Sequence, residues 1–280
     1  MVSSNPLDFG LEGVHVLISG ASGGIGFETV NTFLAAGAKV TAHYNTTPRS
    51  LVDVKHPNLI SLQADVLSET DVTHLFKNAS DAHACPVQIL IVNHGIWPVA
   101  PVKLWDMTLD QWRNTHSVNL DGAFLLCRSF LSQLRSAVLT SSSTSSSLAL
   151  LDPVSICFIG STAGKFGEAD HADYASTKSA LMYGLVPTLK NEIVHIAPKA
   201  RVNSINPGWV RTPMAEETIK DDKVRAKALA STPLQKVAMP KDIANQILVI
   251  SSPNLSAHVT GVNIMVDGGM EGRCLYPPPQ

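Results

Sequence analysis

The sequence predicts an α/β fold in which a doubly wound parallel sheet of about seven strands carries helices on both faces. Short runs rich in Val, Ile and Leu recur along the 280 residues and are the candidate strands, at 14–19, 38–43, 58–62, 87–92, 154–160, 200–205 and 262–266. These runs are almost continuously apolar, as is typical of strands buried on both faces. Helix-like segments separate them, which indicates right-handed crossovers between parallel strands.

The composition excludes several classes of function. The chain has 21 Lys and Arg against 23 Asp and Glu, so it lacks the basic excess that binds a nucleic acid backbone. Its four cysteines form no C-x-x-C pair and no His cluster has zinc spacing, which predicts free thiols and no metal site. The longest apolar runs fall far short of a membrane span. We therefore expect a cytoplasmic protein without nucleic acid, metal or membrane partners.

The chain length suits one large α/β domain over residues 1–280. Residues 140–147 are an unbroken run of Ser and Thr that cannot build a core, so 137–152 is expected to be a loop insertion. Because it precedes a strand, this insertion should lie at the amino ends of the strands, whereas ligands bind outside the carboxyl ends. Residues 270–280 end in a proline-rich segment and are expected to form a short tail.

A glycine-rich turn follows the first candidate strand. Three glycines with the spacing G-x-x-x-G-x-G precede a helical pattern over 27–36. Glycines permit a sharp turn close to a pyrophosphate, which the free N–H groups and the dipole of a helix N-terminus stabilise. The pattern predicts a dinucleotide site that contains Gly20, Ser22, Gly24, Ile25 and Gly26.

The end of the second candidate strand bears on the choice of nicotinamide cofactor. An acidic residue there would bind the ribose 2′-OH of NAD, whereas its absence or a nearby cation admits the 2′-phosphate of NADP. No carboxylate occurs in 39–49. Tyr44, Asn45 and Thr46 can donate hydrogen bonds to a phosphate, and Arg49 either reaches it or projects into water. We therefore favour NADP(H) over NAD(H).

Further motifs follow along the chain: Asp65-Val66 after the third candidate strand, Asn93-His94-Gly95 after the fourth, then Asn119, Ser161, Tyr174 with Lys178, and Pro207-Gly208. Together with the glycine turn, they resemble the short-chain dehydrogenase/reductase family in its single-domain form. The resemblance covers nearly the whole chain and implies a Rossmann-type fold. Three features depart from the family pattern: Ser19 in place of the usual Thr, His94 in place of the usual Ala, and the Ser-rich insertion. Of these, His94 alone falls near the cofactor, where it puts local packing in doubt more than catalysis.

The chemistry of carbonyl reduction explains the candidate catalytic residues. Hydride from a nicotinamide must be accompanied by a proton on the oxygen, and Tyr174 is the candidate acid. A free tyrosine has a pKa near 10, so a cation is needed to stabilise its phenolate, and Lys178 lies on the same helix face four residues later. The resemblance implies that Lys178 also holds the nicotinamide ribose, and that Ser161 orients the substrate oxygen. It further implies that Asn119 anchors a water that relays protons, although Asn119 could equally bond a neighbouring backbone group.

The same resemblance assigns the other cofactor contacts. It implies that Asp65 meets the adenine amino group and that Asn93 stabilises the sheet beside the cofactor. The backbone of Val210 and the hydroxyl of Thr212 should bind the carboxamide. The remaining residues expected in contact with the cofactor are Val66, Gly95, Tyr174, Lys178, Pro207 and Gly208.

Loops after the carboxyl ends of the strands should line the substrate pocket. Trp97, Phe166, Trp209 and Met214 predict an apolar, partly aromatic wall that suits a hydrophobic or aromatic ketone. Any of them could instead close the core. His171 and Asp173 flank the Tyr174 helix, where capping or solvated roles are favoured over acid–base roles.

These observations predict an NADP-dependent oxidoreductase that interconverts a ketone and a secondary alcohol, with secondary metabolism as one expected setting. Two alternatives stay open: a 3-oxoacyl-thioester reductase, and a catalytically idle dinucleotide sensor that regulates a partner. Helices predicted over 102–136 and 172–197 carry apolar residues on more than one face. The family resemblance implies that these helices pack in a homotetramer or homodimer.

Overall fold

The computed structural model describes residues 7–98, 100–140, 150–220 and 222–273. Its centre is a seven-stranded, wholly parallel sheet in the order β3-β2-β1-β4-β5-β6-β7. This confirms the predicted doubly wound fold, and the observed bounds fall within about two residues of the apolar runs. The strands are β1 (His15–Ile18), β2 (Lys39–Tyr44), β3 (Leu59–Gln63), β4 (Ile89–Val92), β5 (Ser155–Ile159), β6 (Arg201–Pro207) and β7 (Asn263–Val266).

Burial follows the position of each strand in the sheet. Every residue of β1, β4, β5 and β6 is buried, because each of these strands has a neighbour on both sides and helices on both faces. The edge strands β3 and β7 contain no fully buried residue. The continuous apolar runs at the centre are therefore a direct consequence of two-sided packing.

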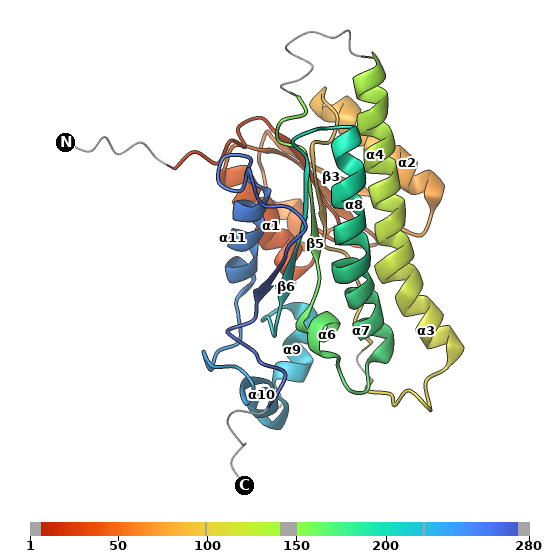
Figure 1. The fold of residues 1–280 in the computed structure, drawn as a ribbon, viewed down its shortest axis with the longest axis vertical. Coiled ribbons are helices and arrows are strands. Elements are labelled where there is room, and N and C mark those ends of the chain that lie inside the picture. Colours follow the sequence, from red (N-terminus) through yellow and green to blue (C-terminus); the bar gives the residue numbers. More distant parts are fainter. Residues whose placement is uncertain (1–6, 99, 141–149, 221, 274–280) are drawn as a thin grey trace, which may run out of the picture.

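Helices cover the two faces of the sheet in separate layers (Figure 1). On one face, α1 (Gly24–Ala35) packs against α11 (Pro240–Ser251), and a core that includes Phe33 and Ile247 lies beneath them. On the other face, α2 (Glu69–His83), α4 (Gly122–Thr140) and α8 (Val186–Glu192) enclose a core around Phe130 and Leu189. No helix within the described ranges is long and apolar enough to cross a membrane.

Two composite helices carry candidate catalytic residues. The first joins α3 (Leu109–His116) to α4 through the π-helical turn η2 (Ser117–Asp121). The second runs from α7 (Ala172–Ser179) through a further π-helical turn, η3 (Ala180–Leu185), into α8 and then the short 3-10 turn η4 (Ile193–His195). Since α3 and η2 contact α7, these helices bring residues from distant parts of the chain together.

The remaining short elements are η1 (Arg49–Asp53), α6 (Thr162–Phe166), α9 (Pro213–Lys220) and α10 (Asp222–Leu229). Figure 1 shows α6, α9 and α10 together at one end of the molecule. They follow the carboxyl ends of β5 and β6. The strand order reverses between β1 and β4, which is where parallel α/β sheets bind their ligands.

Three expected boundaries differ from the structure. The helix expected from residue 102 begins at Leu109, because the side chain of Thr108 caps it by accepting the N–H of Gln111. The helix after the glycine turn begins at Gly24, so the turn itself supplies its first residues. Residues 137–140 of the expected insertion continue α4, while 141–149 and, in the expected tail, 274–280 lie outside the described residues.

Candidate active site

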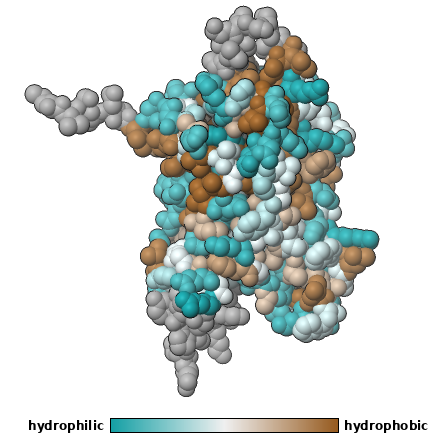
Figure 2. Space-filling model, in the orientation of Figure 1, coloured by the Kyte–Doolittle hydropathy of each residue, from teal (hydrophilic) through white to brown (hydrophobic). Residues whose placement is uncertain are grey.

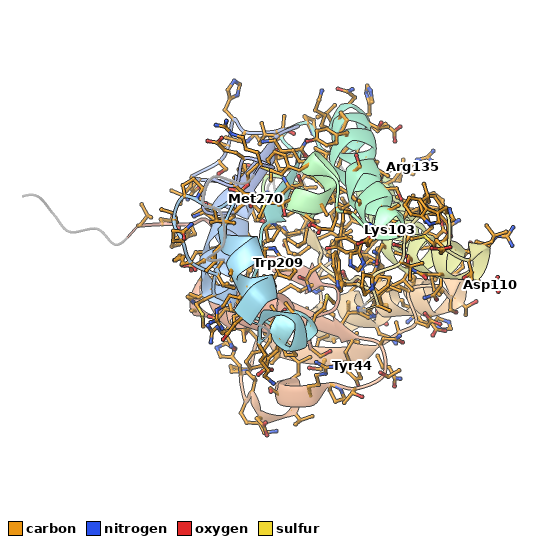
Figure 3. All side chains as sticks on the ribbon, turned by 90° about the horizontal axis from the view of Figure 1, so that it is seen from below. Tyr44, Lys103, Asp110, Arg135, Trp209 and Met270 are labelled. Carbon is orange, nitrogen blue, oxygen red and sulfur yellow. The ribbon has the colours of Figure 1, made fainter. Side chains whose placement is uncertain are left out.

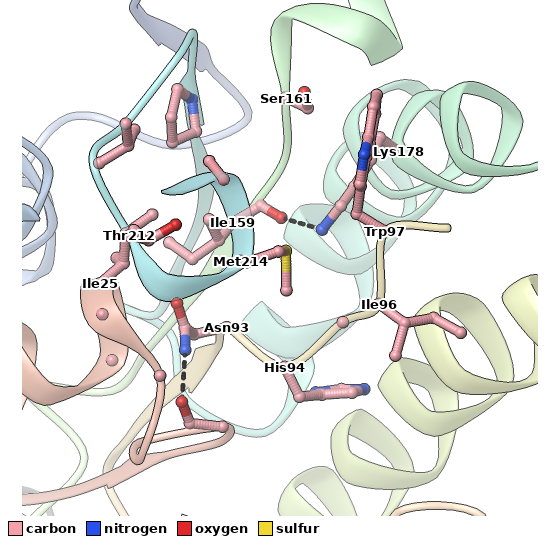
Figure 4. A pocket seen from close by; sticks show the side chains of 18 of the residues that line it. Ile25, Asn93, His94, Ile96, Trp97, Ile159, Ser161, Lys178, Thr212 and Met214 are labelled. Carbon is pink, nitrogen blue, oxygen red and sulfur yellow. Dashed lines mark hydrogen bonds between the residues drawn. The ribbon is translucent and has the colours of Figure 1, made fainter. Parts of the chain in front are cut away.

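A cavity of about 470 Å³ opens at the carboxyl ends of the central strands. Residues from the glycine turn and from the segments after β2, β4, β5 and β6 line it (Figure 4). The structure brings most of the predicted site residues to this cavity: Gly20, Ser22, Gly24, Ile25, Gly26, Asn45, Val66, Asn93, Gly95, Trp97, Ser161, Tyr174, Lys178, Pro207, Gly208, Trp209, Val210, Thr212 and Met214.

The glycine turn packs too tightly for side chains at two positions. Gly20 has a φ of +62°, and a Cβ there would lie 2.8 Å from the Cα of His94. A Cβ on Gly26 would collide with the carbonyl oxygen of Gly20. Asn93 holds the turn, because its Nδ2 donates to the carbonyl oxygens of Ser19 and Gly20, each at 3.0 Å. No side chain caps the N-terminus of α1, so its first N–H groups suit a pyrophosphate.

Tyr174, Ser161 and Lys178 converge at the inner wall of the cavity. Burial raises the pKa of Tyr174 to about 12, although a hydrogen bond with Ser161 acts in the opposite direction. Burial lowers the pKa of Lys178 to about 8. The Nζ atom of Lys178 donates to the carbonyl oxygen of Ile159 at 2.8 Å and lies 5.6 Å from the centroid of the Tyr174 ring. Burial is the largest influence on the pKa of Tyr174, so its hydroxyl is protonated at neutral pH.

Asn119 lies just behind the cavity wall, in η2. Its Oδ1 accepts the N–H of Ile96 at 2.8 Å, and its Nδ2 donates to the Ile96 carbonyl at 3.1 Å and to Thr177 Oγ1 at 3.2 Å. A methyl group on Gly95 would come within 3.2 Å of Asn119 Oδ1 and 3.6 Å of Lys178 Nζ. Asn119 thus hydrogen-bonds a neighbouring backbone group, which the sequence analysis gave as the alternative to anchoring a water. It also lies close to Lys178.

Aromatic rings form one wall. The Trp97 ring lies 4.7 Å from that of Tyr174, edge to face, and 6.5 Å from that of Trp209. His171 packs behind Trp97, with ring centroids 3.9 Å apart, and burial lowers its pKa. Met214 closes the cavity from α9 (Figure 4). This wall is therefore apolar and aromatic beside Tyr174.

Five of the predicted site residues lie off the cavity lining: Tyr44, Thr46, Asp65, Phe166 and Asn119. Tyr44 packs against the core beneath α1, and Thr46 is exposed. Asp65 turns away because its Oδ1 accepts the N–H of Leu67 at 2.9 Å. The Phe166 ring lies beside the backbone of Gly272 and below the Lys165 ammonium, 4.9 Å from its centroid. A residue that follows a strand thus lines the cavity only if the turn after the strand directs its side chain there.

Asp173 lies in the first turn of α7, whereas His171 occupies the N-cap position and makes no side-chain cap bond. Asp173 is fully buried, and its Oδ1 accepts the N–H of Tyr174 at 2.9 Å. Its Oδ2 accepts from Thr115 Oγ1 at 2.8 Å and from Gln111 Nε2 at 3.2 Å. These bonds fix the start of α7 to α3, and so they position Tyr174 through the backbone.

Two buried histidines beside the glycine turn have roles that the sequence did not reveal. His94 Nδ1 lies 2.9 Å from Ser19 Oγ, and its Nε2 lies 3.1 Å from the carbonyl oxygen of Val118, the residue before Asn119. Burial lowers the pKa of His94 to about 3, so Nε2–H donates to Val118 and Nδ1 accepts from Ser19. His43 Nδ1 accepts the N–H of Gly20 at 3.2 Å. The residues next to His43 and His94 in the sequence did not identify these partners.

Comparisons with known proteins identify the family. Residues 20–271 match a family model described as enoyl-(acyl carrier protein) reductase. The chain belongs to the short-chain dehydrogenase/reductase family. Members of this family are oxidoreductases that bind a nicotinamide dinucleotide, act on small molecules and typically form oligomers.

Full-length relatives within the family carry different names. The 3-oxoacyl-(acyl-carrier-protein) reductase of Chlamydia pneumoniae is 28% identical, with 94% of this chain and 99% of that protein covered. A sorbose reductase of Schizosaccharomyces pombe is 27% identical, with 95% and 98% covered. A 3-ketoacyl-(acyl-carrier-protein) reductase from Brucella melitensis, solved with NADH, has a TM-score of 0.79 at 25% identity and covers 92% of this chain and 98% of its own.

Proposed function

We propose that the chain is an NADP-dependent reductase of a hydrophobic or aromatic ketone. The observation that carries this proposal is the convergence of Tyr174, Ser161 and Lys178 on an aromatic-walled cavity that the glycine turn also lines. In the direction of reduction, a protonated Tyr174 is the form required, because the carbonyl oxygen must gain a proton.

Each of these side chains has a separate role in the proposed reaction. Bound NADPH supplies a hydride to the carbonyl carbon. Ser161 and Tyr174 hydrogen-bond the carbonyl oxygen, and Tyr174 transfers its hydroxyl proton to that oxygen as negative charge develops there. Lys178, with a pKa of about 8, is mostly cationic at neutral pH, and its charge favours the resulting phenolate. Asn119 positions Ile96 and, with Lys178, marks the route by which a proton returns from solvent.

The cofactor preference rests on the end of β2. Asn45 and Arg49 line the cavity there, and no carboxylate accompanies them. Arg49 has a φ of +48°, a conformation that non-glycine residues adopt rarely and that clusters at functional sites. We assign Asn45 and Arg49 to the 2′-phosphate, the turn residues to the pyrophosphate, and Val210 and Thr212 to the carboxamide.

A 3-oxoacyl-thioester reductase is the second candidate, since several relatives carry that name. Such an enzyme would need a basic surface to dock an acidic carrier protein. Lys103 and Arg128 are each already paired with a carboxylate, Lys103 with Asp170 and Arg128 with Glu69, both at 2.7 Å. These pairings favour a free ketone over a carrier-bound one.

An oligomer in the cytoplasm is part of the same proposal. Phe124 on α4 is 50% exposed and Tyr183 on η3 is 52% exposed, and a contact between subunits on this face would bury both. Figure 2 shows apolar residues among the polar ones over the face that contains α4, α7 and α8. A homodimer or homotetramer would cover this face, and sedimentation of the purified protein measures its size.

The decisive experiment follows NADPH and NADH oxidation with aromatic ketones, aliphatic ketones, diketones and 3-oxoacyl thioesters. Tyr174→Phe should abolish turnover and leave NADPH binding within about twofold, because it removes one hydroxyl and little contact area. Arg49→Ala should raise the dissociation constant of NADPH and leave that of NADH unchanged. Tight NADPH binding with no turnover of any compound would support the sensor alternative instead, and turnover by Tyr174→Phe would remove Tyr174 as the acid.

A further inference from the structure

Three aromatic rings of the cavity lining meet at steep angles. The Trp97 ring stands at 79° to that of Tyr174, with centroids 4.7 Å apart, and at 70° to that of Trp209, with centroids 6.5 Å apart. Figure 3 shows the end of the molecule where they lie, which Trp209 reaches from the loop after β6. These three rings, called the aromatic corner below, include the residue proposed to donate the proton.

A corner of this shape distinguishes aromatic groups from saturated ones. Aromatic rings attract one another when they are offset-stacked or edge to face, and a saturated ring of similar size lacks the quadrupole that causes this attraction. An aryl group that lies flat against one ring of the corner meets another ring at a steep angle, so both contacts are favourable. The corner therefore discriminates by ring type as well as by size.

His171 supports one side of the corner from behind. Its ring packs on that of Trp97 with centroids 3.9 Å apart and planes inclined by 32°, and His171 lies off the cavity lining. The Nδ1 atom of His171 is buried and has no hydrogen-bond partner among the described residues. The position of this ring therefore depends on packing against Trp97, and a phenyl ring should fill the same space.

The main chain next to Trp97 is fixed, but its side chain needs a separate support. Trp97 lies in the loop after β4, outside the helices and strands. The N–H and the carbonyl of the preceding residue, Ile96, bond to the side chain of Asn119 at 2.8 Å and 3.1 Å. These bonds leave the indole free to rotate about its side-chain torsions. The stack with His171 is the ring contact that holds the indole from outside the cavity.

The loop that carries His171 is fixed to the loop after β4. Asp170, the preceding residue, has a φ of +71°, a strained conformation for a residue other than glycine, and such strain clusters at functional sites. The N–H of Val102 donates to the Asp170 carbonyl at 2.9 Å, and the Lys103 ammonium pairs with the Asp170 carboxylate at 2.7 Å. The chain thus keeps a strained residue beside His171, and this fixes where the His171 ring lies.

We propose that the aromatic corner selects aryl ketones over aliphatic ketones of the same size, and that His171 is a positioning residue that keeps Trp97 in the corner. This inference rests on the proposed ketone reductase function and names its substrate class. His171 acts through Trp97, whereas Tyr174 performs the proton transfer on either kind of ketone.

The test compares acetophenone with cyclohexyl methyl ketone, which has the same number of non-hydrogen atoms but no aromatic ring. The ratio of kcat/KM for the aryl and the cyclohexyl ketone is measured in the wild type, His171→Ala and His171→Phe. Intrinsic reactivity cancels when these ratios are compared. His116→Ala is the matched control, because the His116 ring stacks on that of Trp112 with centroids 4.1 Å apart and neither residue lines the cavity.

We expect the aryl-to-cyclohexyl ratio to fall roughly fivefold in His171→Ala, as the loss of one aromatic contact predicts. Most of the fall should appear as a higher KM for acetophenone, while kcat for cyclohexyl methyl ketone stays unchanged. His171→Phe should restore the ratio to within about twofold of the wild type, since the stack is retained. His116→Ala should leave the ratio unchanged.

Thermal melts identify which variants are folded before the ratios are compared. Trp97→Leu removes a ring of the corner directly and should lower the ratio at least as far as His171→Ala, so it tests the corner even if His171→Ala does not fold. An unchanged ratio in Trp97→Leu, or a ratio in folded His171→Phe as low as in His171→Ala, overturns this inference. Both results leave the reductase function standing.

A binding measurement separates the two possible failures. Calorimetry with NADPH present gives the dissociation constants of both ketones whether or not they react. If the wild type reduces neither ketone but binds acetophenone more tightly, and His171→Ala removes that difference, the ketone reductase proposal fails and the aryl selectivity holds. Equal dissociation constants for the two ketones, or no measurable binding of either, overturn the selectivity.

Discussion

Removal of the His94 side chain tests the polar network behind the glycine turn. His94→Ala deletes the bond to Val118 at 3.1 Å and the bond to Ser19 at 2.9 Å. It also opens space against Gly122, since a Cβ on that glycine would lie 2.9 Å from His94 Nε2. The variant therefore perturbs η2, and with it Asn119, without touching any group proposed to react.

The magnitude follows from these contacts. The two hydrogen bonds contribute about 1 kcal/mol each, and the space left by the ring costs about 1 kcal/mol more. The free energy of unfolding should therefore fall by about 3 kcal/mol. A chain of 280 residues has an unfolding entropy of about 0.6 kcal/mol/K. The melting temperature should thus fall by about 5 °C.

His15→Ala is the matched control. His15 is also fully buried and makes two hydrogen bonds, from Nδ1 to the Cys85 carbonyl at 3.0 Å and from Nε2 to Thr41 Oγ1 at 2.9 Å. It lies at the amino end of β1, the end opposite the cavity. Thermal melts should show a similar loss of stability for the two variants, and ketone reduction is measured well below both melting temperatures. Only His94→Ala should lower kcat/KM, roughly tenfold or more.

Two results would refute this reasoning. Equal losses of kcat/KM in the two variants would mean that His94 acts only through general stability. A melting temperature within 1 °C of the wild type would mean that the network contributes little, whatever its geometry.

Three further predictions concern stability and cofactor binding. Burial lowers the pKa of His15 from 6.5 to about 4, so the folded state favours the neutral ring, and the resulting stability of roughly 3 kcal/mol should be complete above pH 6.5 and lost as the pH falls toward 4. Thermal melts of the wild type and His15→Gln across this pH range should therefore converge at low pH. Arg201→Met should cost about 2 kcal/mol in urea unfolding, because the buried guanidinium donates to the carbonyls of Ile250, Ser251 and Ser256; an unchanged midpoint would contradict this. Gly26→Ala should weaken NADPH binding at least tenfold by calorimetry, whereas Gly184→Ala, whose added Cβ has no atom within 4 Å, should leave binding unchanged. Equal effects of the two substitutions would be evidence against a tight turn at Gly26.

The sequence was sufficient for features that depend on local pattern. The strands could be located because two-sided burial requires continuous apolar runs, and Tyr174 and Lys178 could be paired because four residues make about one helical turn. The glycine spacing likewise identified a turn whose tight packing is visible in Gly20 and Gly26.

Features that depend on distant contacts could not be predicted. The His94 ring bonds to Ser19 across 75 positions of sequence, and no local pattern encodes that distance. Asp65 and Phe166 follow their strands as the pattern requires, but hydrogen bonding and packing in the turns direct them away from the cavity. The extension of α4 through Thr140 was missed because Ser and Thr favour caps and turns, so their run suggested an earlier helix end.

The π-helical turn at Ser117–Asp121 constrains how this chain can change over evolutionary time. A π turn holds about one more residue than an α-helical turn, so it absorbs an extra residue while α3 and α4 stay nearly in phase with each other. Deletion of one residue at the start of α4, where the helix is regular, would instead rotate Leu126, Phe130 and Leu134 by about 100° out of the core. Among descendants of this gene, single-residue changes of length within this composite helix should therefore be confined to Ser117–Asp121, although nothing in the amino-acid types of that stretch marks it as tolerant.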